Sequence, residues 1–167
     1  MTTNHMNYIF LDIDGVLNSE PFMKMHIYDK VSIDESKIKL LSKIVKECDA
    51  KIILTSSRRI TFTKNLKPKD NNRTAKELIR LLNKYEISLF ARTKIYDVDW
   101  DKALREEEIR EYINKNLTKD DNYIILDDED FHKALYNFEN HFILINYQTG
   151  LTTNDVIHAI EILNSNN

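Results

Sequence analysis

The sequence predicts an α/β protein: a three-layer, doubly wound parallel sheet of about five strands without a large cap. Five short apolar runs, rich in β-branched and aromatic residues, have the composition of buried strands. They lie at 8–12, 51–56, 87–91, 123–126 and 141–146. Strands that alternate with helices form a parallel sheet covered on both faces. No repeat or linker divides the 167 residues, so we expect a single domain over 1–167.

The intervening segments carry apolar residues at helical spacing. The four stripes are Ile38, Leu41, Val45 and Cys48; Leu78, Leu81, Leu82 and Tyr85; Ile109, Tyr112, Ile113 and Leu117; and Val156, Ile160 and Leu163. Two of these helices have capping-box spacing at their start, Thr74 with Glu77 and Thr152 with Asp155. Helices of this kind, packed on a sheet through right-handed crossovers, make the doubly wound sandwich.

Composition excludes several classes of protein. Hydrophobic residues make up 42% and charged residues 31% of the chain, as in an ordinary globular protein. The formal net charge of −3 gives no global footprint for nucleic acid or membrane surfaces. The single cysteine excludes an internal disulfide, and no apolar run approaches the length of a membrane span. The first seven residues carry no signal core, so we expect a cytoplasmic location, and the oligomeric state is left open.

The first predicted strand ends in a pair of acids. Asp12 and Asp14 are separated by one residue and followed by Gly15, one of only two glycines in the chain. Open α/β sheets bind ligands at the carboxyl edge, where these side chains would lie. Two carboxylates held this close repel unless a cation or a shared proton compensates. Gly15 suits a sharp turn off the strand.

Three further polar clusters follow in order. Thr55 and Ser56 end the second strand, with Arg58 beyond; their hydroxyls either donate to a phosphoryl oxygen or cap a turn. A basic residue, Arg105, lies near the start of the third helix. Asp127 and Asp128 follow the fourth strand, and consecutive acids at a strand end are good ligands for a hard cation.

Taken together, these four segments resemble motifs I to IV of the haloacid dehalogenase-like (HAD) phosphohydrolases, which have a Rossmannoid fold. The phrases Asp-Gly-Val-Leu-Asn, Ala-Lys-Ile-Ile-Leu-Thr-Ser-Ser, Arg-x-x-Glu-Ile-Arg-Glu-Tyr, Ile-Leu-Asp-Asp and Thr-Gly-Leu-Thr are similar to a narrower group. That group comprises the small capless HAD domains labelled as belonging to Swiss Army Knife RNA repair proteins. The resemblance covers essentially the whole chain.

The resemblance implies a role for the acidic residues. Asp12 is expected to be the nucleophile, which forms an aspartyl-phosphate, and Asp14 the general acid and base. Mg²⁺ is the implied cofactor, held by Asp12, the backbone carbonyl of Asp14 and Asp127. Asp128 is expected to be a further metal ligand or to support one.

The resemblance also implies roles for the hydroxyl and basic residues. Ser56 is favoured over Thr55 as the motif II hydroxyl, and either side chain would bind substrate, with Arg58 close by. The motif III base is expected to be Arg105, with Lys102 and Arg110 as rivals. These groups would position and neutralise the phosphoryl oxygens.

The implied activity is that of a Mg²⁺-dependent phosphomonoesterase. Its phosphorylated substrate would be a nucleic-acid end, such as a 3′-phosphate, or a nucleotide. A small-metabolite phosphatase is the alternative among enzymes, and a HAD module that binds phosphate or a partner without turnover is the alternative outside them.

The intervals between motifs have no room for a large cap, so we expect an open site. The segment 58–76 holds seven basic residues and one acid, either to steer a polyanion or as a solvated surface.

Overall fold

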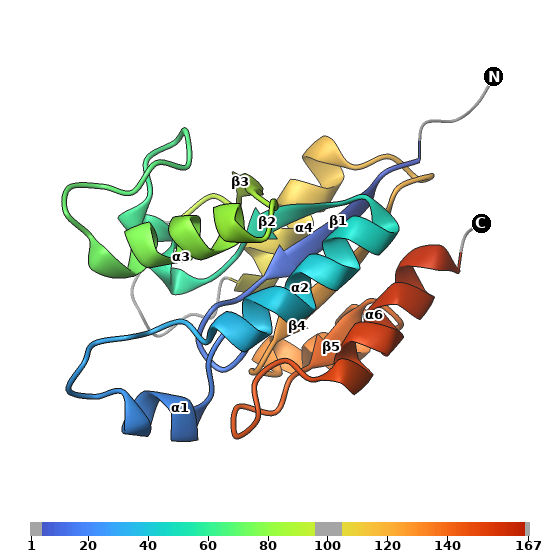
Figure 1. Ribbon diagram of the computed structural model, residues 1–167. Coiled ribbons are helices and arrows are strands. Elements are labelled where there is room, and N and C mark those ends of the chain that lie inside the picture. Colours follow the sequence, from blue (N-terminus) through green and yellow to red (C-terminus); the bar gives the residue numbers. More distant parts are fainter. Residues whose placement is uncertain (1–4, 96–104, 166–167) are drawn as a thin grey trace.

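A computed structural model describes residues 5–95 and 105–165. Its centre is a parallel sheet in the order β3-β2-β1-β4-β5 (Figure 1). The strands are β1 (Asn7–Leu11), β2 (Ala50–Leu54), β3 (Leu89–Arg92), β4 (Asn122–Asp127) and β5 (Phe142–Leu144). All five coincide with the predicted apolar runs to within two residues at each end. The predicted α/β class, parallel sheet and strand number are confirmed.

Helices cover both faces of the sheet. They are α1 (Glu20–Met25), α2 (Glu35–Cys48), α3 (Arg73–Lys84), α4 (Arg105–Asn116), α5 (Ala134–Asn137) and α6 (Thr153–Asn164), with 3₁₀ turns η1 (Ser57–Thr61) and η2 (Phe131–Lys133). One core joins α2, α3 and α6 to side chains such as Leu11 and Leu54. The other joins α4 and α5 to side chains such as Phe10 and Ile53. Alternate residues of β1, β2 and β4 therefore pack into opposite cores, which gives the three layers seen in Figure 1.

Of the two predicted capping boxes, one is present and the other is not. Thr152 and Asp155 form the capping box of α6, as predicted. The box predicted at Thr74 and Glu77 is wrong, because α3 begins two residues earlier than that box requires. Its cap is Asn72, whose side chain accepts from the Ala75 N–H. Asparagine is among the best N-caps. Glu77 instead accepts hydrogen bonds from the backbone and hydroxyl of Ser32.

The strand order creates a topological switch between β1 and β4. The chain runs outward from β1 through β2 to β3, then returns to place β4 on the other side of β1. Connections on the two sides of such a switch lie on opposite faces and leave a crevice at the carboxyl ends of the strands. In the ladder Leu11 pairs with Leu54 on one side and Leu126 on the other. The residues just beyond these three therefore meet at the switch.

Short connections leave the carboxyl edge uncapped. Only α1 and α2 lie between β1 and β2, and only η1 and α3 lie between β2 and β3. Within the described ranges no cap domain is inserted, in agreement with the prediction.

No described helix combines the length and the apolar character that a bilayer crossing requires.

Candidate active site

Three polar residues form a row across the carboxyl edge of the sheet. The Asp12 N–H donates to the Leu126 carbonyl at 3.0 Å, and the Thr55 N–H donates to the Leu11 carbonyl at 2.9 Å. The ladder thus continues one residue past β1 and β2, with Asp12 between Thr55 and Asp127. Strand alternation turns all three side chains toward the face that α4 covers.

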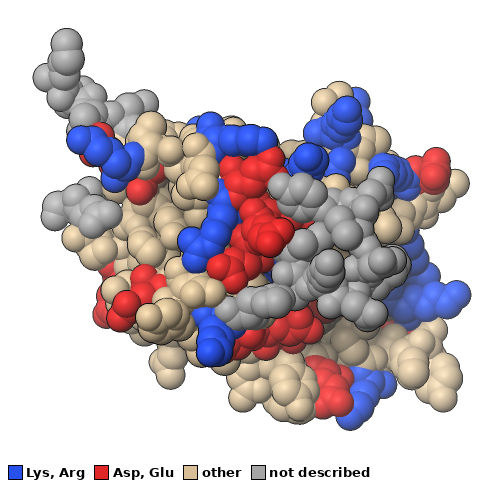
Figure 2. Space-filling view, turned by 180° about the vertical axis from the view of Figure 1, so that it is seen from behind, with Lys and Arg blue, Asp and Glu red and all other residues tan. Residues whose placement is uncertain are grey.

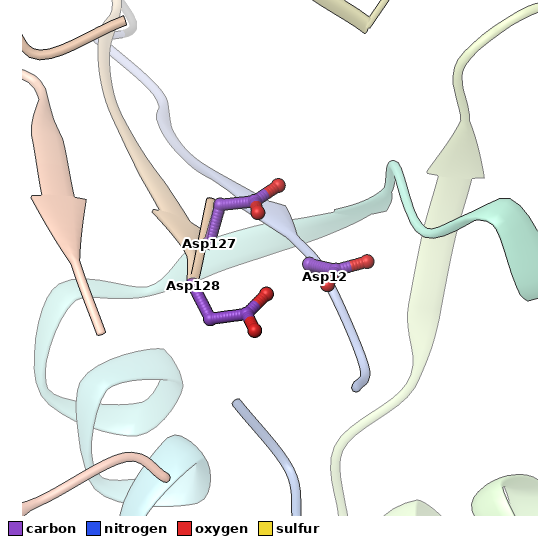
Figure 3. Close-up of side chains that lie close together, drawn as sticks. All are labelled: Asp12, Asp127 and Asp128. Atoms are coloured by element: carbon purple, nitrogen blue, oxygen red, sulfur yellow. The ribbon is translucent and has the colours of Figure 1, made fainter. Parts of the chain in front are cut away.

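Asp12, Asp127 and Asp128 form an acidic group at the switch point. Each offers a carboxylate oxygen, and these atoms all lie within 4.8 Å of one another (Figure 3). Asp12 and Asp127 are buried and Asp128 is half-buried. Burial, followed by the charge of Asp127, raises the pKa of Asp12 to about 7, and the same two causes raise that of Asp128 to about 6. Burial also raises the pKa of Asp127, against the opposing effect of Arg105. Such a group favours a bound cation.

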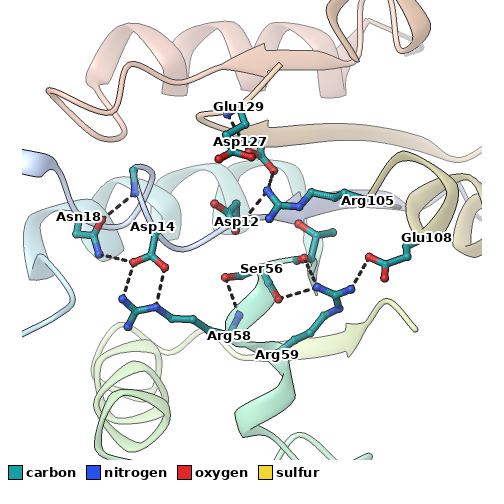
Figure 4. Close-up of polar contacts among 12 residues, drawn as sticks. Asp12, Asp14, Asn18, Ser56, Arg58, Arg59, Arg105, Glu108, Asp127 and Glu129 are labelled. Carbon is teal, nitrogen blue, oxygen red and sulfur yellow. Dashed lines mark hydrogen bonds and ion pairs between the residues drawn. The ribbon is translucent and has the colours of Figure 1, made fainter. Parts of the chain in front are cut away.

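Arg105 is the basic residue that reaches this group. It is the first residue of α4, and its Nη1 lies 2.7 Å from Asp127 Oδ2 and 3.9 Å from Asp12 Oδ1 (Figure 4). Arg110, one of its two predicted rivals, pairs instead with Glu106 and lies over the ring of Phe138. The other rival, Lys102, lies outside the described residues.

Asp14 is held apart from the acidic group by a two-pronged ion pair. Arg58 Nε donates to Asp14 Oδ2 at 2.7 Å, and Arg58 Nη2 donates to Oδ1 at 2.6 Å (Figure 4). The amide of buried Asn18 also donates to Oδ1, at 3.2 Å, while its carbonyl oxygen accepts from the Gly15 N–H at 2.8 Å. Bidentate arginine–carboxylate pairs fix direction as well as distance. The Asp14 carboxylate therefore has a defined orientation in the turn after β1.

Gly15 lies in this turn, and Gly150 packs against it. Gly15 has φ +74°, and a Cβ there would lie 2.3 Å from Asp128 Oδ2. Gly150 has φ +63°, and a Cβ there would lie 2.6 Å from the carbonyl oxygen of Asn18. Only glycine accepts such contacts in the left-handed region without strain. The loop after β5 thus supports the Asp14 turn from outside.

The two predicted hydroxyls have different surroundings. Ser56 Oγ accepts from the Arg58 N–H at 3.2 Å and caps η1. Thr55 is fully buried, and its hydroxyl is one of the few buried side-chain groups in the described residues without a hydrogen-bond partner. Thr93, which continues β3 beside Thr55, has the same property. The Thr55 hydroxyl, in the row of Asp12, is therefore buried with its hydrogen-bonding capacity unused.

Several buried polar residues near the site had no role assigned from the sequence, among them Asn18, Thr93, Arg59 and Glu108. Arg59 donates to backbone carbonyls behind the row and pairs with Glu108 on α4. Arg59 lies in the basic segment 58–76, whose charges were expected either to steer a polyanion or to be solvated. Glu108 lies three residues after Arg105, a spacing that places both on one helix face. A second signal was the family resemblance, because Asn18 and Glu108 lie in the phrases Asp-Gly-Val-Leu-Asn and Arg-x-x-Glu-Ile-Arg-Glu-Tyr.

A comparison with protein families decides the relationship. The family described as the HAD domain in Swiss Army Knife RNA repair proteins matches residues 8–156. The chain belongs to this family. The match extends from β1 into α6 and includes all four predicted motifs, so the predicted HAD relationship is confirmed. No curated relative and no solved structure matches the chain.

Proposed function

We propose that this HAD domain is a Mg²⁺-dependent phosphomonoesterase that forms an aspartyl-phosphate at Asp12. The observation that carries the proposal is the group of Asp12, Asp127 and Asp128, with Arg105 beside it, at the switch point of the sheet. This is the place where doubly wound sheets bind their ligands. Structural ion networks also gather acids, but here the acids lie at the ligand-binding edge of the sheet, and Arg105 pairs with two of them, Asp12 and Asp127.

The donor set fits Mg²⁺. Three carboxylate oxygens within 4.8 Å of one another are hard ligands, and an ion bound by them would retain waters, as Mg²⁺ prefers. Asp12, Asp127 and Asp128 would hold the ion. When bound, it would offset the negative charge that otherwise keeps a carboxylate away from an anionic phosphate. Arg105 supplies part of this compensation from the protein itself.

The protein residues then divide the chemistry. A carboxylate oxygen of Asp12 attacks phosphorus, the bond from phosphorus to the leaving oxygen breaks, and Asp14 delivers a proton to that oxygen. In the second half, Asp14 takes a proton from water, which attacks the phosphorus of the aspartyl-phosphate and releases phosphate and free Asp12. Asn18 and Arg58 hold the Asp14 carboxylate as a hydrogen-bond acceptor, which suits the step that takes a proton from water. An Asp14 that carries the proton for the leaving oxygen gives up at least one of these bonds.

The phosphoryl oxygens would be bound by the groups around Asp12. Arg105 is already within reach of Asp12, and the Thr55 hydroxyl lies in the same row without a partner. Ser56 remains the second candidate, since its hydroxyl accepts a hydrogen bond and still has a proton to donate. Catalysis of phosphoryl transfer is mostly positioning and charge stabilisation of this kind.

We propose a phosphorylated nucleic-acid end, such as a 3′-phosphate, or a nucleotide as the substrate. The description of the family as RNA repair proteins supports this class. A cavity of about 490 Å³ beside Thr93 adds local support, because its described lining includes four cations, Lys64, Arg92, Lys94 and Lys115, against two acids. Figure 2 shows Lys and Arg on both sides of a band of acidic side chains. Local cations of this kind suit a short anionic end better than a long duplex.

Phosphate release tests the activity. Wild-type protein with Mg²⁺ should hydrolyse 4-nitrophenyl phosphate, and Asp12→Asn should abolish turnover while retaining the fold, as measured by circular dichroism. Loss of turnover on chelation of Mg²⁺ should be reversed by adding it back. Turnover that persists in Asp12→Asn would contradict the nucleophile.

A second assay separates the substrate classes. Oligonucleotides with a 3′-phosphate, free nucleotides and sugar phosphates are compared by kcat/KM at two salt concentrations. Preference for the oligonucleotide, weakened by salt, supports the nucleic-acid end. Preference for sugar phosphates would favour a small-metabolite phosphatase. Binding of phosphate without turnover of any ester would favour a non-catalytic module.

A further inference from the structure

Behind the row of Thr55, Asp12 and Asp127 lies a buried guanidinium. Arg59 is only 5% exposed. Its Nη1 donates to the carbonyl oxygens of Thr55 at 2.7 Å and Ser56 at 2.9 Å, and its Nη2 donates to the carbonyl oxygen of Lys94 at 3.3 Å. Thr55 and Ser56 follow β2, and Lys94 follows β3. One side chain thus holds the backbone at the carboxyl ends of two neighbouring strands.

A carboxylate on the facing helix completes this arrangement. Glu108 is 6% exposed and forms an ion pair with Arg59 Nη2 (Figure 4). Glu108 lies within one turn of Arg105 on α4, and Arg105 contacts Asp127 and Asp12. The Arg59–Glu108 pair therefore joins the Thr55–Ser56 backbone to the helix turn that carries Arg105.

Stability alone is a weak explanation for such a pair. Removing two charges from water is costly, and well-packed apolar residues in place of a buried ion pair are often equally or more stabilising. Arginine does, however, have a property that apolar residues and lysine lack. Its planar fork can satisfy several acceptors in fixed directions at once.

We propose that Arg59 and Glu108 are positioning residues, which set the distance between the Thr55–Ser56 segment and Arg105 on either side of Asp12. The inference rests on the proposed function, because both groups act on the phosphoryl group. In this arrangement neither Arg59 nor Glu108 contacts the transferred phosphoryl group. They act by fixing the places where a hydroxyl and a guanidinium meet the phosphoryl oxygens.

The geometry sets the expected size of the effect. A displacement of about 1 Å caused by a change away from the reacting atoms costs about a hundredfold in rate. The metal ligands come from the ends of β1 and β4, whereas Arg59 donates to the backbone that follows β2 and β3 and to Glu108 on α4. Loss of the pair should therefore reduce kcat strongly and leave the affinity for Mg²⁺ unchanged.

Two conservative variants test the proposal in the full-length chain. In Glu108→Gln the side chain keeps its shape and loses its charge. In Arg59→Lys the side chain keeps its charge and loses the planar guanidinium, which donates in several fixed directions. Glu106→Gln is the matched control, since Glu106 is on the same helix and its partner Arg110 lies away from the acidic group. We expect kcat for 4-nitrophenyl phosphate to fall about a hundredfold in both variants and to be unchanged in the control. The Mg²⁺ affinity, measured by calorimetry, should stay within about twofold.

A phosphate mimic makes the test independent of turnover. With Mg²⁺ present, beryllofluoride affinity should fall at least about tenfold in both variants and remain unchanged in Glu106→Gln. The double variant Arg59→Lys/Glu108→Gln should lose little more than the worse single variant, because residues that act as a unit are not additive.

The outcomes separate this inference from the proposed function. The positioning role would be overturned if folded Glu108→Gln had a kcat and a beryllofluoride affinity within threefold of wild type. If Arg59→Lys does not fold, the result for Glu108→Gln decides. A wild-type protein that binds beryllofluoride but hydrolyses no phosphate ester would refute the phosphatase activity, while the mimic affinities still decide the positioning role. A wild-type protein that does neither would overturn both.

Discussion

The affinity for Mg²⁺ should depend steeply on pH below neutrality. Burial, and then the charge of Asp127, raises the pKa of Asp12 to about 7 and that of Asp128 to about 6. Metal ligands must be deprotonated, so binding to the protonated site releases protons. The sign follows directly. Lowering the pH through 7 and then 6 protonates the two carboxylates in turn, and each protonation opposes the metal.

The two pKa values predict the magnitude. At pH 6 a carboxyl of pKa about 7 is protonated in about ten of eleven molecules, and one of pKa about 6 in about half, so binding should release about 1.4 protons. The apparent affinity should fall about twentyfold between pH 8 and pH 6 from these two groups. The raised pKa of Asp127 acts in the same direction.

Calorimetric titration with Mg²⁺ in buffers of different ionisation enthalpy measures both quantities. Asp128→Asn should lower the proton release at pH 6 by about half a proton and weaken binding at pH 8. Glu139→Gln, which removes an exposed acid outside the acidic group, should change neither. An affinity that is constant from pH 8 to pH 6, with no proton release, would refute the raised pKa values of Asp12 and Asp128. Unchanged Mg²⁺ binding in Asp128→Asn would refute Asp128 as a ligand.

Two further predictions concern the row and the turn beside it. Thr55→Val should change the free energy of unfolding by less than about 1 kcal/mol, because the lost hydroxyl has no partner, yet it should lower kcat. Ser56→Ala should lower the free energy of unfolding by about 1 kcal/mol, because the cap of η1 is lost. Urea unfolding and phosphate release measure both, and a larger kcat loss for Ser56→Ala would restore Ser56 as the phosphoryl-binding hydroxyl. Gly150→Ala should destabilise by at least about 1 kcal/mol, since the new methyl meets the Asn18 carbonyl at positive φ; unchanged urea unfolding would contradict this.

Much of the fold was predictable because each layer leaves a local pattern. Strands buried on both faces read as continuous apolar runs, and the helices between them show an apolar stripe. The box at Thr152 and Asp155 was readable for the same reason, since its two partners lie one turn apart. The failure at Thr74 and Glu77 shows the limit of such rules. Asn72 competes for the same helix start, and Glu77 has a distant partner in Ser32.

The acidic group followed from one general property of parallel sheets. Their strand ends meet at a single edge, so Asp12 and Asp127 could be placed together without knowledge of the packing. The remaining site contacts join segments far apart in the chain. Arg58 meets Asp14 across 44 residues, and Arg59 meets Glu108 across 49. No periodicity or capping rule connects such positions, and a basic segment in isolation resembles a solvated surface.

The two hydroxyls show why a one-residue uncertainty matters at a strand end. The sequence favours Ser56 by the spacing of a serine from Arg58. In the structure β2 ends at Leu54, and the next backbone bond, from Thr55 to Leu11, keeps the ladder in register. Because side chains alternate along a strand, this register turns Thr55 to the same face as Asp12, whereas Ser56 begins the next turn and caps it. The choice between the hydroxyls therefore depends on where the strand stops, which is the feature that residue patterns determine least well.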